Sequence, residues 1–252
     1  MPTQTKVFNP AAVTTILCDA DGNLFPSEEI AFEASVVVTN DLAAELGIKE
    51  RFDAEQLRLA TTGKNFRTLA QELSAGTGKW GQPQRGLTGE ELERWIAEEK
   101  RVVSAHLNKT LRPDPDVVEV LRSLAQSYGL AVVSSSALSR LRKCFEATGL
   151  EEFFPPERCF SAEDSLPTPV SKPDPAVYLQ AIKELGLTPG ETLAIEDSLP
   201  GAQSAVAAGC QTIGNLRFVA PAERDERRRQ LEDAGVVAVI SSWPELLPLL
   251  RG

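Results

Sequence analysis

The hydrophobic and polar positions follow different periods in different parts of the chain. Residues 14–18 form a short apolar, β-branched run that stops abruptly at an acid, a pattern typical of a strand buried on both faces. From about residue 113 onward, more short apolar runs alternate with helical patterns. These later runs predict strands over 130–133, 159–160, 192–195, 211–213 and 236–240.

The helical patterns between these runs are amphipathic, and several stop at a glycine, where helices commonly end. They extend over 116–128, 138–148, 174–185, 199–208 and 244–250. Strands and helices that alternate with short links form parallel sheets with right-handed crossovers. We therefore predict an α/β fold with a doubly wound, Rossmann-like parallel sheet that includes the first strand.

Between the first strand and about residue 111 the pattern is helical, and no convincing buried strand interrupts it. The helical stretches are 28–47, 53–61, 65–73 and 88–107. Thr88 and Glu91 have the spacing of a capping box, and Ser27 is a candidate N-cap for the first helix. An all-helical insertion in a doubly wound domain accounts for this order economically. We predict a core domain from 1–26 plus 112–252, with the helical insertion over 27–111.

The composition fits an ordinary soluble globular protein, with 252 residues, 42% of them hydrophobic and 25% charged. No apolar run approaches the roughly 18 residues of a membrane span, and the first ten residues lack a long apolar stretch, so we expect no signal peptide and a cytoplasmic location. The net charge of -10 argues against nucleic-acid or anionic-membrane partners. An anionic substrate would need a metal ion or a few well-placed basic residues.

The cysteines and the histidine exclude several kinds of site. Cys18, Cys144, Cys159 and Cys210 are scattered singly, a spacing that fits neither a zinc site nor a disulfide framework and favours a reducing compartment. His106 is the single histidine, so mechanisms that need paired histidines cannot be assembled. Because His106 lies in a charged helical stretch, we expect a surface or hinge residue.

Polar residues with complementary chemistry follow the predicted strands. Asp19 and Asp21 come directly after the first strand, where two close carboxylates need a cation, a shared proton or a substrate. Ser134 is the first polar residue after the strand over 130–133. Glu196 and Asp197 follow the strand over 192–195. Ligands of open α/β sheets bind at these carboxyl ends of the strands.

Lys172 completes the set, because it precedes a helix start and can lie beside an anion drawn there. Each feature alone has a simpler interpretation: a turn, a strand-end cap, a solvated lysine or an acidic helix N-terminus. For these simpler interpretations to be correct, all four features would have to occur independently, in this order and at successive strand ends. Two acidic pairs with one lysine and one serine instead predict a site for a hard cation, Mg²⁺, together with a phosphate.

Because of these motifs, the chain resembles hydrolases of the haloacid dehalogenase superfamily with a helical cap (subfamily IA). That group contains phosphoglycolate phosphatase, sugar-phosphate phosphatases and β-phosphoglucomutase. The four family motifs are matched by Asp19-Ala20-Asp21-Gly22, Ser134, Lys172-Pro173-Asp174-Pro175, and Ile195-Glu196-Asp197-Ser198 with Gly201. The match covers essentially the whole chain. One departure is Asn23, where the family usually has Thr, and it leaves fine positioning open.

The resemblance implies a role for each motif. Asp19 is implied to attack phosphorus and form an aspartyl-phosphate, and Asp21 to act as general acid and then as general base. Ser134 and Lys172 are implied to bind the phosphoryl oxygens.

The resemblance also implies the ligands of the metal ion. Asp19, the backbone carbonyl of Asp21 and Asp197 would hold Mg²⁺, with Glu196 close to the metal. The helical insertion would be a cap that closes over the site and excludes water. In the cap, residues 63–67 resemble the glycine-containing loop that enters the active site of relatives, which makes Lys64, Asn65 and Arg67 candidates for substrate contacts. A solvated surface is the alternative for these three.

A second glycine pattern, Gly76-Thr77-Gly78-Lys79-Trp80-Gly81, matches GxGxxG but follows a helix and has no βαβ context. A dinucleotide site is not expected there. The charged stretch 222–229 predicts a solvated helix, with a partner surface as the alternative.

We expect a Mg²⁺-dependent phosphatase that acts on a small phosphorylated metabolite, as a monomer or homodimer, with a sugar phosphomutase of the β-phosphoglucomutase kind as the alternative. A halidohydrolase is disfavoured because those relatives need no metal. A phosphonate hydrolase would need a Schiff-base lysine in the cap, for which only Lys64 or Lys79 could serve. A catalytically silent binding protein is disfavoured by the intact set of acids and Lys172.

Overall fold

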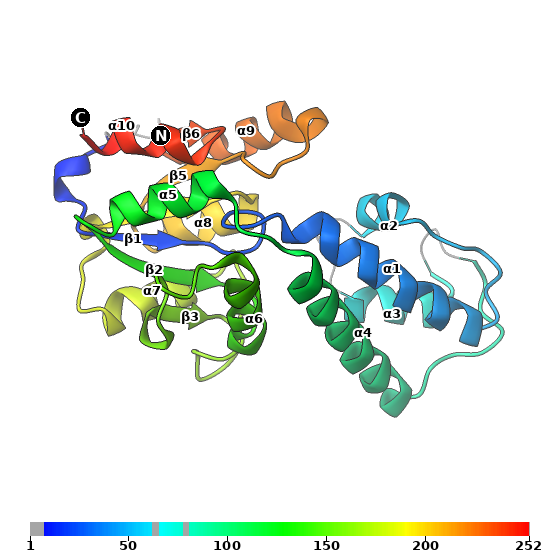
Figure 1. The fold of residues 1–252 in the computed structure, drawn as a ribbon. Coiled ribbons are helices and arrows are strands. Elements are labelled where there is room, and N and C mark those ends of the chain that lie inside the picture. The colour runs from blue at the N-terminus through cyan, green and yellow to red at the C-terminus, as the bar shows by residue number, and fades with distance from the viewer. Residues whose placement is uncertain (1–7, 62–65, 78–80, 252) are drawn as a thin grey trace, which may run out of the picture. The chain divides into compact units, whose positions relative to one another are not determined.

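The computed structural model describes residues 8–61, 66–77 and 81–251. The chain forms two compact units, one from Met1–Pro26 with Leu111–Gly252 and the other from Ser27–Thr110. The first, the α/β unit, contains the sheet, and the second, the helical unit, contains only helices and loops among its described residues (Figure 1).

The α/β unit is built on a six-stranded parallel sheet in the order β3-β2-β1-β4-β5-β6, which confirms the predicted fold class. Its strands are β1 (Thr15–Cys18), β2 (Gly129–Ser134), β3 (Cys159–Ser161), β4 (Thr192–Glu196), β5 (Gln211–Asn215) and β6 (Ala238–Ile240). The chain runs outward from β1 to β2 and β3, and then returns to β4 on the other side of β1. The strand order therefore reverses between β1 and β4, which is where ligands bind in doubly wound folds.

Helices of the α/β unit lie between successive strands in the chain, except for α10, which follows the last strand (Figure 1). They are α5 (Pro115–Leu124), α6 (Leu138–Thr148), α7 (Ala176–Glu184), α8 (Leu199–Ala207), α9 (Arg224–Asp233) and α10 (Leu246–Arg251). The predicted helix over 116–128 stops earlier because the chain turns at its end, where the N–H groups of Ser127 and Tyr128 both bond to the carbonyl of Leu124. The predicted helix over 244–250 begins later, since Pro244 lies in a 3₁₀ turn.

The core of the α/β unit lies where the central strands meet α7 and α8. Leu17 of β1, Ala131 of β2 and Ala194 of β4 are fully buried and belong to one cluster with Val177 of α7 and Ala205 of α8. Small residues in the central strands allow the two helices to approach the sheet closely. This packing fixes the ends of β1, β2 and β4 relative to one another.

The helical unit consists of α1 (Ser27–Glu45), α2 (Ala54–Ala60), α3 (Phe66–Ala75) and α4 (Gly89–Thr110). Its core comes from leucines of α1, α2 and α3, such as Leu42, Leu57 and Leu69. The capping box before α4 is confirmed, since Thr88 and Glu91 exchange hydrogen bonds of 2.8 and 3.2 Å. The prediction of Ser27 as an N-cap is wrong. Ser27 is the first helical residue, and its buried Oγ has no hydrogen-bond partner among the described residues.

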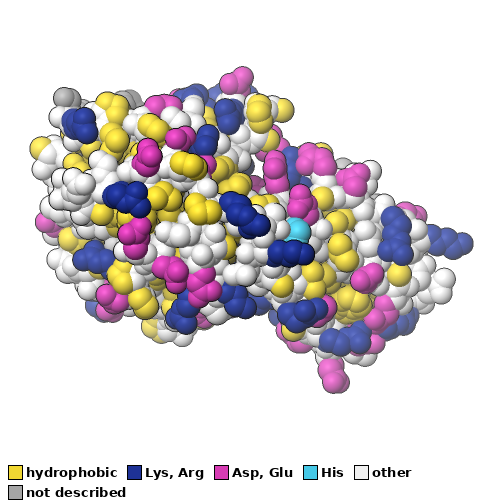
Figure 2. Space-filling view, viewed as in Figure 1, with side chains coloured by type: hydrophobic (Ala, Val, Ile, Leu, Met, Phe, Trp, Pro, Cys, Tyr) yellow, Lys and Arg dark blue, Asp and Glu magenta, His cyan; other side chains and the backbone are white. Residues whose placement is uncertain are grey.

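Other expectations concern single side chains and the surface. The four cysteines are free, and Cys18 and Cys210 are buried. Nε2 of His106 lies 3.0 Å from a carboxylate oxygen of Glu33 in the helical unit. Figure 2 shows acidic and basic side chains interspersed over the described part of the visible face. Of the helices that the structure describes, none combines the length and the apolar character that crossing a membrane requires.

Candidate active site

Asp19 and the turn after it are held at the carboxyl ends of β1 and β4. The backbone N–H of Asp19 donates to the carbonyl of Ile195 at 3.0 Å, so the residue after β1 lies beside the end of β4. Gly22 has a φ of 75°, and a Cβ at this position would lie 2.5 Å from Oδ2 of Asp197. Glycine is therefore required here both by the backbone conformation and by the space that the Asp197 carboxylate occupies.

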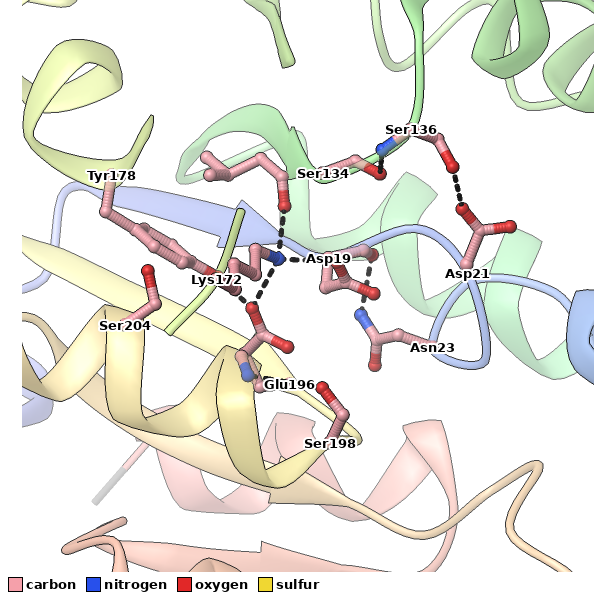
Figure 3. Close-up of polar contacts among 12 residues, drawn as sticks. Asp19, Asp21, Asn23, Ser134, Ser136, Lys172, Tyr178, Glu196, Ser198 and Ser204 are labelled. Carbon is pink, nitrogen blue, oxygen red and sulfur yellow. Dashed lines mark hydrogen bonds and ion pairs between the residues drawn. The ribbon is translucent and has the colours of Figure 1, made fainter. Parts of the chain in front are cut away.

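Lys172 lies at the centre of the site and donates to three acceptors (Figure 3). Its Nζ is 2.6 Å from Oδ1 of Asp19, 2.7 Å from Oε1 of Glu196 and 2.9 Å from the carbonyl oxygen of Val133. Burial opposes the positive charge, but the carboxylates of Asp19 and Glu196 outweigh it and raise the pKa of Lys172. The lysine is thus a fixed positive charge between two acids.

Glu196 is completely buried, and its two oxygens have different surroundings. Oε1 accepts from Lys172 and also from Oη of Tyr178 at 2.5 Å. Oε2 has no hydrogen-bond partner among the described residues. A Cβ on Gly201 would lie 1.8 Å from Oε2, so glycine at that position makes room for the carboxylate. A buried carboxylate oxygen without a partner is costly unless a cation or a proton joins it.

Asp197 is held by an arginine from α9. Nη1 of Arg227 donates to the backbone carbonyl of Asp197 at 2.7 Å and lies 4.0 Å from its Oδ2. Burial, followed by the negative charge of Glu196, raises the pKa of Asp197 to about 7, and Arg227 acts in the opposite direction. The charged stretch at 222–229 therefore contributes one residue to the site as well as a partly exposed helix.

The acids of the site form a group that fits a hard cation. Oxygens of Asp19, Glu196 and Asp197 all lie within 4.8 Å of one another, and all three residues are buried. Burial and the charges of the other two acids raise the pKa of Asp19 well above its ordinary value, although Lys172 lowers it. Lys172 contacts two of these acids, Arg227 lies near the third, and Oε2 of Glu196 has no partner among the described residues. This all-oxygen donor set suits Mg²⁺.

Ser134 and Asp21 lie on the other side of Asp19, toward the loop after β2. Ser134 is the last residue of β2, and its buried Oγ accepts from the N–H of Ser136 at 3.0 Å. Asp21 is not part of the acidic group, because its carboxylate is directed to that loop instead. Oδ2 of Asp21 accepts from Oγ of Ser136 at 2.6 Å, and Oδ1 accepts from Nη2 of Arg140 at 2.9 Å.

Asn23, the departure from the family pattern, is a fully buried link between three segments. Its Nδ2 donates to the carbonyl oxygens of Asp19 at 2.8 Å and Ile195 at 3.2 Å. Its Oδ1 accepts from Asn215 at the end of β5, and its carbonyl accepts from Nε1 of Trp243 at 3.0 Å. The amide thus joins the ends of β1, β4 and β5, which a threonine hydroxyl could not do with the same number of donors.

The three cap candidates are only partly described. Lys64 and Asn65 lie outside the described residues. Arg67 lies at the start of α3 in the helical unit, where its guanidinium forms a two-point ion pair with Glu93. Their expected role in substrate recognition stays a prediction.

Sequence reasoning did not find several residues that complete the site. Tyr178 could have been suspected, because a hydroxyl on the apolar face of a helix needs a buried partner. Ser136 lies in the run Ser134-Ser135-Ser136, in which the position directly after the strand pattern indicates Ser134 alone. Arg140 and Arg227 lie in charged helical stretches where most side chains are solvated, so their spacing carries no signal of their contacts.

Comparison with known proteins gives consistent matches. A family model for haloacid dehalogenase-like hydrolases matches residues 13–209. Protein CbbY of Cereibacter sphaeroides is 30% identical over 243 residues, which cover 93% of this chain and 94% of CbbY. Hexitol phosphatase B of Escherichia coli (strain K12) is 30% identical over 207 residues, which cover 81% of this chain and 84% of that protein.

Solved structures share the fold. A mutant of CbbY from Rhodobacter sphaeroides in complex with xylulose-(1,5)bisphosphate superposes with a TM-score of 0.69 at 24% identity, covering 94% of this chain and 99% of that one. At this identity the likeness shows the fold alone. In this chain, that fold places Asp19, Ser134 and Glu196 at or directly after strand ends, and the side chain of Lys172 reaches them from the segment before α7.

Proposed function

The chain belongs to the haloacid dehalogenase-like hydrolase family, and on that premise we propose that it is a Mg²⁺-dependent phosphatase acting through an aspartyl-phosphate. The observation that supports this most strongly is the position of Lys172, whose Nζ contacts both Asp19 and Glu196 inside the acidic group. A phosphoryl group that approaches Asp19 meets this ammonium group, which offsets the repulsion between the phosphate and the carboxylates.

In the first step an oxygen of Asp19 attacks phosphorus, and the bond from phosphorus to the leaving oxygen breaks. Asp21 donates a proton to that oxygen, so the product leaves as an alcohol. Lys172 and the hydroxyl of Ser134 bind the other phosphoryl oxygens, which keeps phosphorus in line with the attacking oxygen. The phosphoryl group is then bonded to Asp19, and Asp21 is a carboxylate.

In the second step a water oxygen attacks the same phosphorus, and its proton passes to Asp21. The bond between phosphorus and the Asp19 oxygen breaks and releases inorganic phosphate. Asp19 is again a carboxylate and Asp21 again carries a proton, so the cycle is balanced. Asp21 thus acts as an acid in one step and as a base in the other.

The residues that would hold Mg²⁺ are Asp19, Asp197 and the backbone carbonyl of Asp21, with Glu196 beside them. When bound, the ion supplies positive charge that neutralises the phosphoryl oxygens. The oxygen of Glu196 that has no partner among the described residues supports this assignment. Lys172 and Tyr178 hold the other oxygen of Glu196, which fixes the position of the carboxylate.

We also propose that the helical insertion over 27–111 is the cap of the enzyme and contributes to substrate choice. Lys64, Asn65 and Arg67 are the candidates for contacts with the substrate. Arg67 would have to exchange its ion pair with Glu93 for a substrate group. The substrate class we favour is a phosphorylated sugar or polyol, because one relative is named a hexitol phosphatase and another is solved with a bound sugar bisphosphate.

Phosphate release from a panel of phosphate esters tests the proposal. The panel contains sugar and polyol phosphates, phosphoglycolate, nucleotides and an aryl phosphate, each with Mg²⁺ and with a chelator. We expect release that requires Mg²⁺ and falls by at least about 10³-fold in Asp19→Asn, the loss expected when a nucleophile is removed. Asp225→Asn on the exposed face of α9 serves as the matched control and should keep full activity.

Two results would contradict the proposal. Phosphate release that persists in Asp19→Asn would show that Asp19 is not the nucleophile. Full activity in the presence of the chelator would show that the reaction does not require Mg²⁺. Conversion of a hexose 1-phosphate into its 6-phosphate without free phosphate would instead favour a phosphomutase.

A further inference from the structure

The carboxylate of Asp21 is held at both oxygens by residues that the family motifs do not include. Oγ of Ser136 donates to Oδ2 at 2.6 Å, and Nη2 of Arg140 donates to Oδ1 at 2.9 Å. Asp21 and Arg140 are both part-buried, so this ion pair is screened less than one on the surface. Figure 3 shows Ser136 and Asp21 facing each other beside the acidic group.

The two donors are themselves fixed by the structure around them. The N–H of Ser136 donates to Oγ of Ser134, which ties the serine to the end of β2. Arg140 lies in the first turn of α6, and the N–H of Leu138 at the start of that helix donates to Asp164 at 2.7 Å. The donors therefore occupy defined positions relative to the strand ends.

The turn that carries Asp21 packs against the same helix. The ring of Phe25, at the end of this turn, meets the ring of Phe145 of α6 edge to face, with centroids 6.2 Å apart. Within the turn, the N–H of Gly22 donates to the carbonyl of Phe25 at 3.0 Å. Helix α6 thus supports the backbone of the turn and also supplies the arginine that contacts the Asp21 side chain.

We propose that Ser136 and Arg140 are positioning residues that orient the carboxyl group of Asp21 for proton transfer to the leaving oxygen. This inference rests on the proposed function, in which Asp21 is the general acid of the first step. When Asp21 passes its proton to the leaving oxygen, the phosphorus–oxygen bond breaks and Asp21 becomes a carboxylate. Arg140 and Ser136 then bind that carboxylate through the contacts seen here.

If Arg140 positions the general acid, its effect on the rate of cleavage depends on the leaving group of the substrate. An alkoxide is a poor leaving group and needs a proton as the bond breaks, whereas a nitrophenolate leaves well without one. A misplaced general acid therefore slows the cleavage of alkyl phosphates strongly and that of activated aryl phosphates only slightly. A general loss of structure would slow both classes alike.

The test measures kcat/KM for a series of phosphate monoesters whose leaving groups span alkyl alcohols to nitrophenol. This ratio reports only the steps up to departure of the leaving group, so hydrolysis of the phosphorylated enzyme does not enter. In Arg140→Ala we expect a loss of about 10- to 100-fold for alkyl esters and of less than about threefold for nitrophenyl phosphate. Arg140→Lys should restore part of the loss, and Ser136→Ala should show the same trend more weakly.

Arg142→Ala is the matched control, because Arg142 is an exposed arginine of the same helix that lines a separate pocket with Phe154 and Cys159. It should leave the whole series unchanged. A uniform loss across the series in Arg140→Ala, or no loss, would overturn the positioning role.

Asp21→Asn separates this inference from the proposed function. If Asp21→Asn makes kcat/KM depend more steeply on the leaving group and Arg140→Ala does not, only the positioning role of Ser136 and Arg140 fails. If Asp21→Asn itself shows no such dependence, then Asp21 is not the general acid, and the proposed mechanism fails with it.

Discussion

At the scale of single residues, the two oxygens of the Glu196 carboxylate differ in what they contact. Two donors, Lys172 and Tyr178, bind the same oxygen of this buried acid. The other oxygen has no partner among the described residues and lies against the backbone at Gly201. The donors therefore fix the carboxylate through one oxygen, and the proposed Mg²⁺ would satisfy the other. The space that Gly201 provides is part of this arrangement.

Gly201→Ala is predicted to disturb the acidic group. Its Cβ would lie 1.8 Å from Oε2 and 2.4 Å from Cδ of Glu196, so the carboxylate must move and weaken its bonds to Lys172 and Tyr178. We expect the free energy of unfolding to fall by about 1–3 kcal/mol, as for other overpacked sites. Mg²⁺ binding, measured by calorimetry, should weaken as well.

Gly190→Ala is the control for this substitution, because no described heavy atom lies within 4 Å of a Cβ there. We expect its free energy of unfolding to stay within about 0.5 kcal/mol of the original protein. If the two variants bind Mg²⁺ and unfold alike, the account of Gly201 is incorrect.

At the scale of elements, the candidate active site is assembled largely from the ends of parallel strands, and this explains which of its residues the sequence could predict. Asp19, Ser134 and Glu196 each end or follow a strand, and parallel strands in one sheet bring their carboxyl ends to one edge. Their proximity therefore follows from the strand pattern. Arg140 and Arg227 belong to helices, and only the packing of α6 and α9 decides which of many charged side chains reaches the site.

A second link at this scale joins the turn after β1 to the segment after β6. Nε1 of the fully buried Trp243 donates to the carbonyl of Asn23, whose side chain joins the ends of β1, β4 and β5. The hydrogen bond spans 220 residues of sequence, so no local pattern could have indicated it. The segment after β6 thus supports the turn that carries Asp19 and Asp21, the two acids with proposed catalytic roles.

Trp243→Phe is predicted to lower the stability of the α/β unit. The substitution keeps most of the buried apolar surface but removes the donor to the Asn23 carbonyl, which we expect to cost about 1–3 kcal/mol. Urea unfolding followed by circular dichroism measures the change.

Trp95→Phe in the helical unit is the matched control, because the buried Nε1 of Trp95 has no partner among the described residues. Removing an unsatisfied donor should leave stability equal or slightly higher. Equal destabilisation by both substitutions would indicate that ring volume, and not the hydrogen bond to Asn23, accounts for the loss.

At the scale of the whole molecule, the alternation of strands and helices was sufficient to predict the doubly wound sheet with a helical insertion. The chain carries a net charge of -10 and gathers three of its acids in one buried group. Collecting acids in this way reduces the stability of the metal-free protein, because burial disfavours their charged forms. A bound cation would offset that cost, which links folding, pH and metal binding.

The stabilisation by Mg²⁺ is predicted to grow as the pH rises from 5 to about 8, a range that spans the raised pKa of Asp197. Burial raises this pKa from 3.8 to about 7 in the folded protein. A raised folded-state pKa contributes stability at low pH, and that stability is lost as the pH passes through about 7. Without metal, the protein should therefore lose stability over this range, and Mg²⁺, which favours the ionised acid, should restore it.

The measurement is the melting temperature in saturating Mg²⁺ minus that in chelator, at several pH values. Comparing the two conditions at each pH cancels titrations elsewhere in the chain. An increment that stays constant or shrinks with rising pH would show that the acidic group is not where Mg²⁺ acts.

In the proposed mechanism Asp19 carries the phosphoryl group, and trapping that group on the protein tests the mechanism at its first step. Asp21→Asn, treated with nitrophenyl phosphate and Mg²⁺, can form the intermediate without a general acid but lacks the base that hydrolyses it. After a rapid acid quench, peptide mass spectrometry locates the adduct. We expect a phosphoryl group on Asp19. A phosphoryl group on another residue, or phosphate release with no adduct on any peptide, would contradict it.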